Sequence, residues 1–248
     1  MTAGEETERA SRLLAAGERL IVALDVPGEA EAYRLVDQLG EAVSFYKVGF
    51  ELFVAAGPAM VRGLIKRGKR VFLDLKFFDV GETVQRAARA AARLGATFLT
   101  VHGHASAQQA AVRGAAGSGL QILIVTLLTS LDHDDVKELF GPAATPAAII
   151  RQRVEKAMAN GIHGVIASGQ EVAEIRALAG DRLLIVTPGI RPSGAGADDH
   201  KRASTPFESI RGGADYLVVG RPIRDAADPR AAAQAIVAEI EEGLKARA

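Results

Sequence analysis

The chain has 248 residues, of which 48% are hydrophobic, and its 30 Lys+Arg balance its 30 Asp+Glu to a formal net charge of zero. This length suits one large α/β domain or two small ones, and the neutral balance gives no indication of a nucleic-acid or anionic-membrane partner. The lack of cysteine excludes disulfides, thiolate metal sites and a cysteine nucleophile, and is consistent with a cytoplasmic location. No apolar run reaches the roughly 18 residues that a membrane span requires.

Short apolar runs alternate with longer amphipathic stretches along the chain. Residues 1–18, rich in Glu and Arg, predict an N-terminal helical extension and not a signal peptide. The runs predicted to be strands are Leu20–Leu24, Val43–Val48, Arg70–Leu73, Thr97–Val101, Gln121–Leu127, Gly164–Ala167, Leu183–Thr187 and Tyr216–Val219. The predicted helices include Glu29–Leu39, Pro58–Arg67, Val80–Leu94, Thr145–Asn160, Glu171–Leu178, Pro206–Gly212 and Pro229–Arg247.

Eight strands that alternate with helices predict a (β/α)₈ TIM barrel, with residues 1–248 forming one domain. The alternative is an open, doubly wound sheet. A nucleotide-binding sheet of that kind would begin with a Gly-rich turn after its first strand, and the segment 23–27, Ala-Leu-Asp-Val-Pro, contains no glycine. The barrel is therefore the better prediction.

Charged and hydroxyl-bearing residues follow most of the predicted strands, although the strand interiors are apolar. These residues are Asp25, Lys47, Asp74, Lys76, Asp79, His102, His104, Thr126, Thr129, Ser130, Ser168, Thr187, Arg191 and Arg221. Barrel enzymes build their active sites at the carboxyl ends of the strands. Because packing alone does not demand such residues, the pattern predicts a functional site at this end of the barrel.

The stretch from Asp74 to Asp79 is the most informative part of this pattern. Residues two apart on a strand share a face, so Asp74 and Lys76 are predicted to project together, near Lys47 on the neighbouring strand. Flanking carboxylates favour protonated lysines, which suit proton donation better than imine formation. The alternatives are a surface ion-pair network and a Mg²⁺ site formed by Asp25, Asp74 and Asp79, which a lysine in the same ring opposes.

The last two loops of the barrel predict an anion site. Arg191 and Arg221 each lie beside glycine and proline, and Gly220 lets backbone N–H groups approach a phosphate. The Gly-rich segment Ser193–Asp199 is interpreted as a lid over the substrate or as an inert surface loop.

Two further pairs of residues near the predicted strand ends each allow two interpretations. Thr129 and Ser130 either hydrogen-bond a polar ring or cap a helix that begins near Asp132. His102 and His104 either ligate a metal or, more commonly, are hydrogen-bonded histidines at the rim.

On its motifs, the sequence resembles the orotidine 5′-monophosphate decarboxylase family from Leu20 to Asp228. The matching motifs are Ala23–Asp25, Tyr46–Gly49, Asp74–Val80 with Thr83, Val125–Ser130, Thr187–Arg191 and Val219–Arg221. The resemblance implies a cofactor-independent, metal-free decarboxylation of orotidine monophosphate to uridine monophosphate, in de novo pyrimidine synthesis. It also implies a homodimer with shared active sites.

The resemblance further implies roles for individual residues. Lys76 would protonate C6 of the pyrimidine, Asp74 would lie beside the departing carboxylate, and Lys47 and Asp79 would complete the charged network. The implied substrate ligands are Asp25 for the ribose, Thr129 or Ser130 for the base, Arg191 and Gly220–Arg221 for the phosphate, and Asp79 with Thr83 for the partner's site. His200 stands where the family commonly has Gln, and is expected to contact the phosphate side of the substrate.

Two other functions remain open from the sequence. Mg²⁺-dependent sugar-phosphate aldolases and decarboxylases with related barrels share the Asp-x-Lys-x-x-Asp pattern. They tend to carry a metal-binding Glu at the position of Lys47, so this lysine favours the metal-free reaction. The other is a catalytically inactive barrel that serves as a nucleotide-binding or interaction module, against which the intact charged residues argue.

Overall fold

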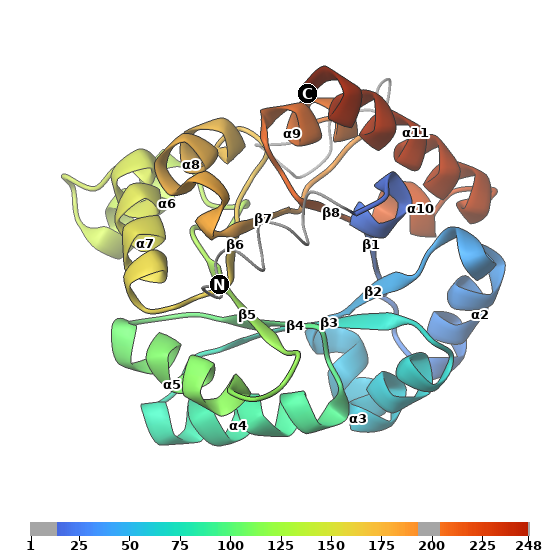
Figure 1. The fold of residues 1–248 in the computed structure, drawn as a ribbon, viewed down its shortest axis with the longest axis horizontal. Helices are drawn as coiled ribbons and strands as arrows, with labels where there is room; N and C mark the ends of the chain where they lie inside the picture. Colours follow the sequence, from blue (N-terminus) through green and yellow to red (C-terminus); the bar gives the residue numbers. More distant parts are fainter. Residues whose placement is uncertain (1–13, 193–203, 248) are drawn as a thin grey trace.

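The computed structural model describes residues 14–192 and 204–247. Within these residues, parallel strands close into a barrel in the sequential order β1 to β8, and helices surround it (Figure 1). The strands are β1 Leu20–Ala23, β2 Phe45–Val48, β3 Arg70–Phe77, β4 Phe98–Val101, β5 Gln121–Val125, β6 Gly164–Ile166, β7 Leu184–Thr187 and β8 Tyr216–Val219. The predicted (β/α)₈ barrel is confirmed.

The helices cover the outer face of the barrel. They are η1 Ala16–Arg19, α2 Glu29–Leu39, η2 Gly40–Ala42, α3 Phe50–Lys66, α4 Gly81–Leu94, α5 Ala105–Ala115, α6 His133–Phe140, α7 Pro146–Ala159, α8 Val172–Ala179, η3 Gly180–Arg182, α9 Pro206–Gly212, α10 Arg221–Arg224 and α11 Pro229–Arg247. Of the predicted helical extension 1–18, residues 1–13 lie outside the described part, and the short helix η1 occupies the end of the extension. None of the described helices is both long and apolar enough to cross a membrane.

Helix α3 consists of two helical segments that meet at Gly57, whose φ of 61° and ψ of −160° are not helical. The second segment begins at Pro58, as predicted and as is common for proline in the first turn of a helix, whereas the segment before Gly57 was not predicted. The additional first turn begins at Phe50, directly after β2, and therefore adjoins the end of the strand that carries Lys47.

Aromatic side chains fill the interior of the barrel. Phe98 packs against Phe45, Phe72 and Tyr216 with ring centroids 5.1, 5.9 and 5.2 Å away. Alternate residues of each strand point inward, so the remaining strand residues pack against the helices. Phe72 also lines the cavity at the carboxyl ends of the strands, which identifies this aromatic layer as the floor of that cavity.

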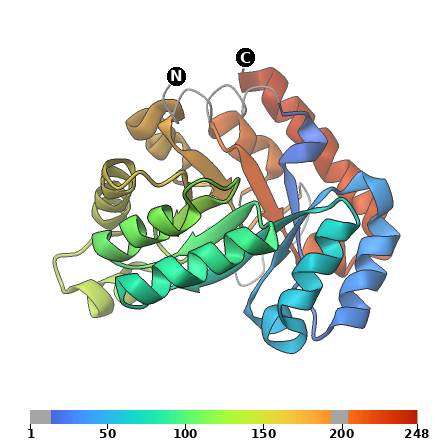
Figure 2. The ribbon, with the colours of Figure 1, turned by 60° about the horizontal axis from the view of Figure 1, so that its bottom comes forward.

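Helices α4 and α5 lie side by side outside β3 and β4 (Figure 2). Gly114 of α5 allows this close approach, because a Cβ atom there would lie 2.4 Å from the carbonyl oxygen of Gln85 on α4. The helix pair therefore holds β3 and β4 from outside, and these are the strands whose irregular pairing shapes the site.

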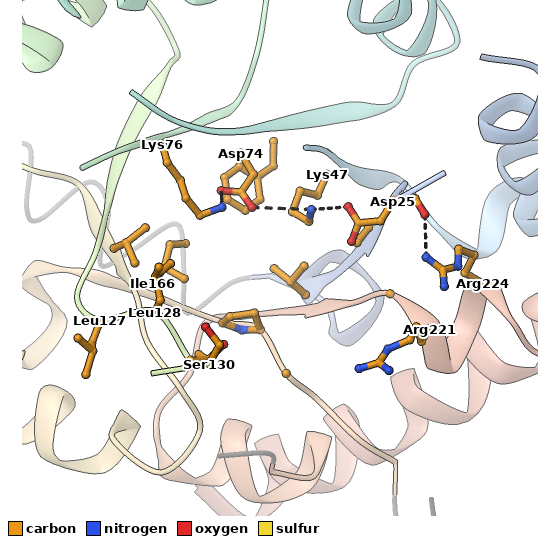
Figure 3. A pocket seen from close by; sticks show the side chains of 18 of the residues that line it. Asp25, Lys47, Asp74, Lys76, Leu127, Leu128, Ser130, Ile166, Arg221 and Arg224 are labelled. Atoms are coloured by element: carbon orange, nitrogen blue, oxygen red, sulfur yellow. Dashed lines mark hydrogen bonds and ion pairs between the residues drawn. The ribbon is translucent and has the colours of Figure 1, made fainter. Parts of the chain in front are cut away.

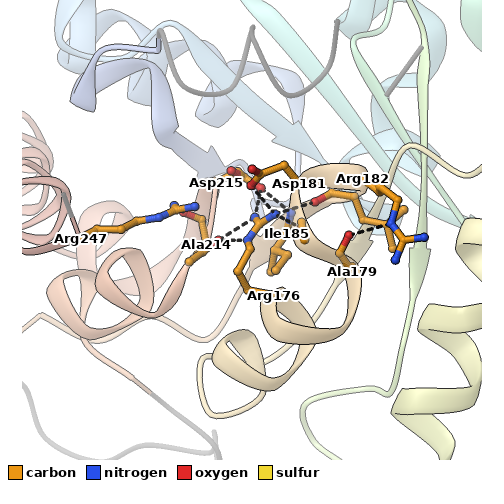
Figure 4. Close-up of polar contacts among 11 residues, drawn as sticks. Arg176, Ala179, Asp181, Arg182, Ile185, Ala214, Asp215 and Arg247 are labelled. Carbon is orange, nitrogen blue, oxygen red and sulfur yellow. Dashed lines mark hydrogen bonds and ion pairs between the residues drawn. The ribbon is translucent and has the colours of Figure 1, made fainter. Parts of the chain in front are cut away.

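A buried ion pair joins the amino ends of β7 and β8, opposite the predicted site (Figure 4). The carboxylate of Asp215, whose side chain is 4% exposed, accepts from the Arg176 guanidinium at 2.6 Å and from the Ile185 N–H at 2.8 Å. Arg176 also donates to the carbonyls of Gly213 and Leu183. Because both charges are hydrogen-bonded, burial is tolerated, and the position at the amino ends indicates a role in stability.

We expect the free energy of unfolding to fall as the pH drops below about 6.5, the ordinary pKa of histidine. Burial lowers the pKa of His163, whose Nδ1 accepts a hydrogen bond from the Ile122 N–H at 3.1 Å, as only the neutral ring can. The unfolded chain then binds the proton more readily than the folded chain, so acid favours unfolding. Denaturant unfolding at pH 7.5 and 5.5 measures this, and His163→Asn, which keeps an acceptor but cannot titrate, is expected to weaken the dependence.

Candidate active site

A cavity of about 400 Å³ opens at the carboxyl ends of the strands (Figure 3). It contains nine of the residues that the sequence predicted for the site. They are Asp25, Lys47, Asp74, Lys76, Thr129, Ser130, Arg191, Gly220 and Arg221. They come from segments far apart in the chain and meet only because the barrel closes.

Four charged side chains of alternating sign form a chain along one wall of the cavity (Figure 3). Lys47 Nζ lies 2.8 Å from Asp25 Oδ1 and 3.7 Å from Asp74 Oδ2, and Lys76 Nζ lies 2.9 Å from Asp74 Oδ1. The side chains of Lys47 and Asp74 are 11% and 16% exposed, and that of Lys76 is 29% exposed. Each inner charge therefore has an opposite neighbour, and Lys76 ends the chain with its ammonium group accessible to a ligand in the cavity.

Asp74 and Lys76 lie in the carboxyl-terminal part of strand β3, where its pairing with β4 is irregular. The sequence predicted that the strand stops at Leu73, but it continues to Phe77, with a shift in its register against β4. Lys76 has a φ of 41°, a left-handed conformation that costs a residue other than glycine about 1–2 kcal/mol. Such conformations cluster at functional sites, where surrounding contacts maintain them.

Asp79, predicted to complete the charged network, and Thr83, predicted with Asp79 to reach into a partner's site, are not among the residues that line the cavity. Asp79 is exposed beyond β3, and its carboxylate accepts the Val80 N–H at 2.6 Å. Thr83 is exposed in the first turn of α4. Within the described part of the chain, these two residues therefore do not contribute to the cavity of their own subunit.

Arg221, from the loop after β8, lies at the opposite side of the cavity from Lys76 (Figure 3), and Arg191, from the loop after β7, also lines the cavity. Arg221 begins α10 directly after Gly220. The backbone N–H of Arg191 donates to the Ser204 carbonyl at 3.0 Å, which ties the loop after β7 to the start of α9. This end of the cavity offers guanidinium groups to an anion. His200, the fourth residue predicted there, lies outside the described residues.

Sequence reasoning missed Arg224, which also lines the cavity. Its guanidinium donates to the Asp25 carbonyl at 2.7 Å and pairs with Asp225 at 2.6 Å, and this hydrogen-bonded pairing raises the pKa of Arg224. Its position three residues after Arg221, within one helical turn, could have indicated from the sequence that it lies near the same cavity. The apolar lining was also missed, because Leu127, Leu128 and Ile166 are indistinguishable from core residues in the sequence.

The described residues form neither of the two metal sites that the sequence left open, the one with Asp25, Asp74 and Asp79 or the one with His102 and His104. His102 and His104 do not line the cavity; both rings contact Phe78, with centroids 6.2 and 6.4 Å away. Burial, with Arg153 and Lys76 nearby, lowers the pKa of His102. Among residues 14–192 and 204–247, no three His, Asp or Glu are grouped to hold a metal ion.

Comparison with known proteins places the chain in a family. Residues 18–236 match the model of the orotidine 5′-phosphate decarboxylase / HUMPS family. Orotidine 5′-phosphate decarboxylase from Afipia carboxidovorans is 52% identical over 90% of this chain and 94% of its own length, and the one from Cereibacter sphaeroides is 53% identical over 91% and 98%.

Solved structures agree with this assignment. The crystal structure of orotidine 5′-phosphate decarboxylase from Lactobacillus acidophilus has a TM-score of 0.80 and 37% identity, and covers 90% of this chain and 99% of that one. An uncharacterized conserved protein from Geobacillus kaustophilus has a TM-score of 0.78 and 31% identity over 89% and 99%. The chain therefore belongs to the orotidine 5′-phosphate decarboxylase / HUMPS family.

Proposed function

We propose that the chain catalyses the decarboxylation of orotidine 5′-monophosphate to uridine 5′-monophosphate, without a cofactor or a metal. The observation that carries the proposal is the alternating Asp25–Lys47–Asp74–Lys76 chain, which faces arginines across a cavity of nucleotide size. The named relatives support the same activity. Because the pathway is nucleotide biosynthesis, we expect the enzyme to act in the cytoplasm.

The geometry suggests how the substrate lies in the cavity. Its phosphate binds the guanidinium groups of Arg191 and Arg221, and its ribose lies near Asp25, at the outer end of the charged chain. The base then reaches the strand ends, where Thr129 and Ser130 supply hydrogen-bonding hydroxyls. Phosphate binding far from the reacting carbon provides energy that orients the base, which is how remote contacts raise the rate of a chemical step.

Lys76 supplies the reaction's electrophile and its proton. As the bond between C6 and the carboxylate breaks, CO₂ departs and the electron pair remains on C6. The ammonium group of Lys76, held 2.9 Å from Asp74, stabilises this developing negative charge and then transfers a proton to C6. Solvent subsequently reprotonates the amine. Asp74 has a second effect, because its charge disfavours the substrate carboxylate more than the transition state in which that charge has moved away.

Lys47 discriminates this reaction from the Mg²⁺-dependent chemistry of related barrels. Its ammonium lies between Asp25 and Asp74, where a divalent cation would have to displace it. The test follows the loss of orotidine monophosphate absorbance with and without a chelator. Equal rates are expected. Turnover only after addition of Mg²⁺, or binding of uridine monophosphate without any turnover, would contradict the proposal.

We also propose a homodimer in which each subunit lends Asp79 and Thr83 to its partner's site. Both residues are exposed, and Phe78 and Val80 beside them are 68% and 66% exposed, more apolar surface than a monomer needs to show. Phe50, 57% exposed, lies with its ring centroid 5.7 Å from Lys76 Nζ. The exposed apolar surface therefore extends to the charged chain, as a shared site requires.

Mixing two inactive variants tests the shared site. We expect Lys76→Ala and Asp79→Ala to be inactive separately. In a mixed dimer, one site carries both lesions and the other carries neither, so equal mixing should restore roughly a quarter of the wild-type sites. Each variant alone, treated identically, is the control. If native mass spectrometry shows that mixed dimers have formed and no activity is recovered, the lending of Asp79 is contradicted.

A further inference from the structure

The pairing of β3 with β4 is irregular at the site. Leu73 pairs with Leu99 and Phe77 with Val101, so three residues of β3 lie opposite the single residue Thr100 of β4. Extra residues of this kind interrupt the ladder of backbone hydrogen bonds and redirect the side chains beside them. Two of the three are Asp74 and Lys76. A backbone group left without its ladder partner requires another one when it is buried.

Thr100 supplies that partner. It is fully buried, and its Oγ1 accepts the backbone N–H of Lys76 at 2.9 Å. The same hydroxyl donates to Asp74 Oδ1 at 2.8 Å, and that oxygen also accepts from Lys76 Nζ at 2.9 Å. One hydroxyl thus holds the backbone of one member of the pair and the carboxylate of the other, and the contacts form a closed ring.

We infer that Thr100 is a positioning residue for the Asp74–Lys76 pair, an inference that rests on the proposed function. The left-handed backbone of Lys76 directs its side chain into the cavity, and the bond from its N–H to Thr100 maintains that conformation. The bond to Oδ1 fixes the rotation of the Asp74 carboxylate, so that Oδ2 lies toward Lys47. Thr100 itself does not line the cavity and acts through the two residues that it holds.

The chemistry of the site restricts which residue serves here. The position needs a group that accepts one hydrogen bond and donates another from a single buried atom, which a hydroxyl does. Serine retains both functions. Valine matches the shape of threonine and removes both, which leaves the Lys76 N–H and Asp74 Oδ1 without this partner.

The test compares Thr100→Val, Thr100→Ser and Thr126→Val in the full chain. Thr126 is the matched control, because it is equally buried and its hydroxyl donates to the Ile166 carbonyl at 2.8 Å without contacting the charged pair. We expect Thr100→Val to lower kcat roughly 10- to 100-fold with KM for orotidine monophosphate within about threefold, since the phosphate contacts remain. Thr100→Ser and Thr126→Val should keep kcat within about threefold of wild type.

Three outcomes would overturn the inference: an unchanged kcat in Thr100→Val, an equal loss in Thr100→Ser, or an equal loss in Thr126→Val. Amide hydrogen exchange of the wild type adds a test that does not depend on a variant's folding. The Lys76 amide should be protected, and exchange as fast as that of an exposed amide would also overturn it. A wild type that does not turn over orotidine monophosphate would instead refute the proposed function. The exchange experiment would still show whether Thr100 holds the Lys76 backbone, because it does not depend on turnover.

Discussion

Replacing Lys76 by alanine is expected to lower kcat for orotidine monophosphate by roughly 10⁴-fold or more, because the variant lacks both the proton donor and the charge opposite C6. The fold should persist, since the side chain is 29% exposed, at the end of a strand, and contributes to the site and not to the core. The measurement is the rate of absorbance loss, with circular dichroism and thermal unfolding to establish that the variant is folded.

Lys66→Ala provides the control for this experiment. Lys66 is exposed in the last turn of α3, so its removal also deletes one positive charge but should leave kcat unchanged. Decarboxylation by Lys76→Ala at a rate near wild type would refute the role of Lys76. An unfolded Lys76→Ala chain would contradict the statement that the residue serves the site alone.

Replacing Arg221 by alanine is expected to weaken the binding of uridine monophosphate by about 3 kcal/mol, or roughly a hundredfold in Kd, because hydrogen bonds to a charged phosphate are lost. Binding of uridine, which has no phosphate, should stay the same in wild type and variant. Titration calorimetry with both ligands separates the contribution of the phosphate from that of the base and ribose.

The control here is Arg211→Ala, which removes an exposed arginine from α9 with no contact to the cavity. It should leave both affinities unchanged. If Arg221→Ala weakened uridine as much as uridine monophosphate, the residue would be shaping the cavity and not binding the phosphate. Unchanged affinity for uridine monophosphate would place the phosphate elsewhere.

The eight strands and the nine predicted residues that line the cavity were predictable from the sequence because both follow from local patterns. Buried parallel strands are apolar runs, and a charge directly after such a run is conspicuous. Lys47 and Asp74 were found in this way, and the barrel then brings them to within 3.7 Å. The arginine loops were found by their glycines and prolines and by their position after the last two strands.

The irregular end of β3 was not predictable, because register depends on the partner strand. Thr100 lies inside an apolar run and has the same appearance there as a β-branched core residue. Only the structure, through the pairing of Leu73 with Leu99 and of Phe77 with Val101 and the hydrogen bonds of Thr100, shows that its hydroxyl faces Asp74 and Lys76. The helical segment from Phe50 to the break at Gly57 was also not predicted, whereas the segment that begins at Pro58 was.

The most direct test of the central claim is the stoichiometry of the reaction with purified protein in buffer treated to remove metals. The charged chain with Lys47 between Asp25 and Asp74 predicts that each orotidine monophosphate consumed yields one uridine monophosphate and one CO₂, at a rate that added Mg²⁺ does not raise. Consumption of a sugar phosphate in its place, or a rate that depends on Mg²⁺, would contradict the account.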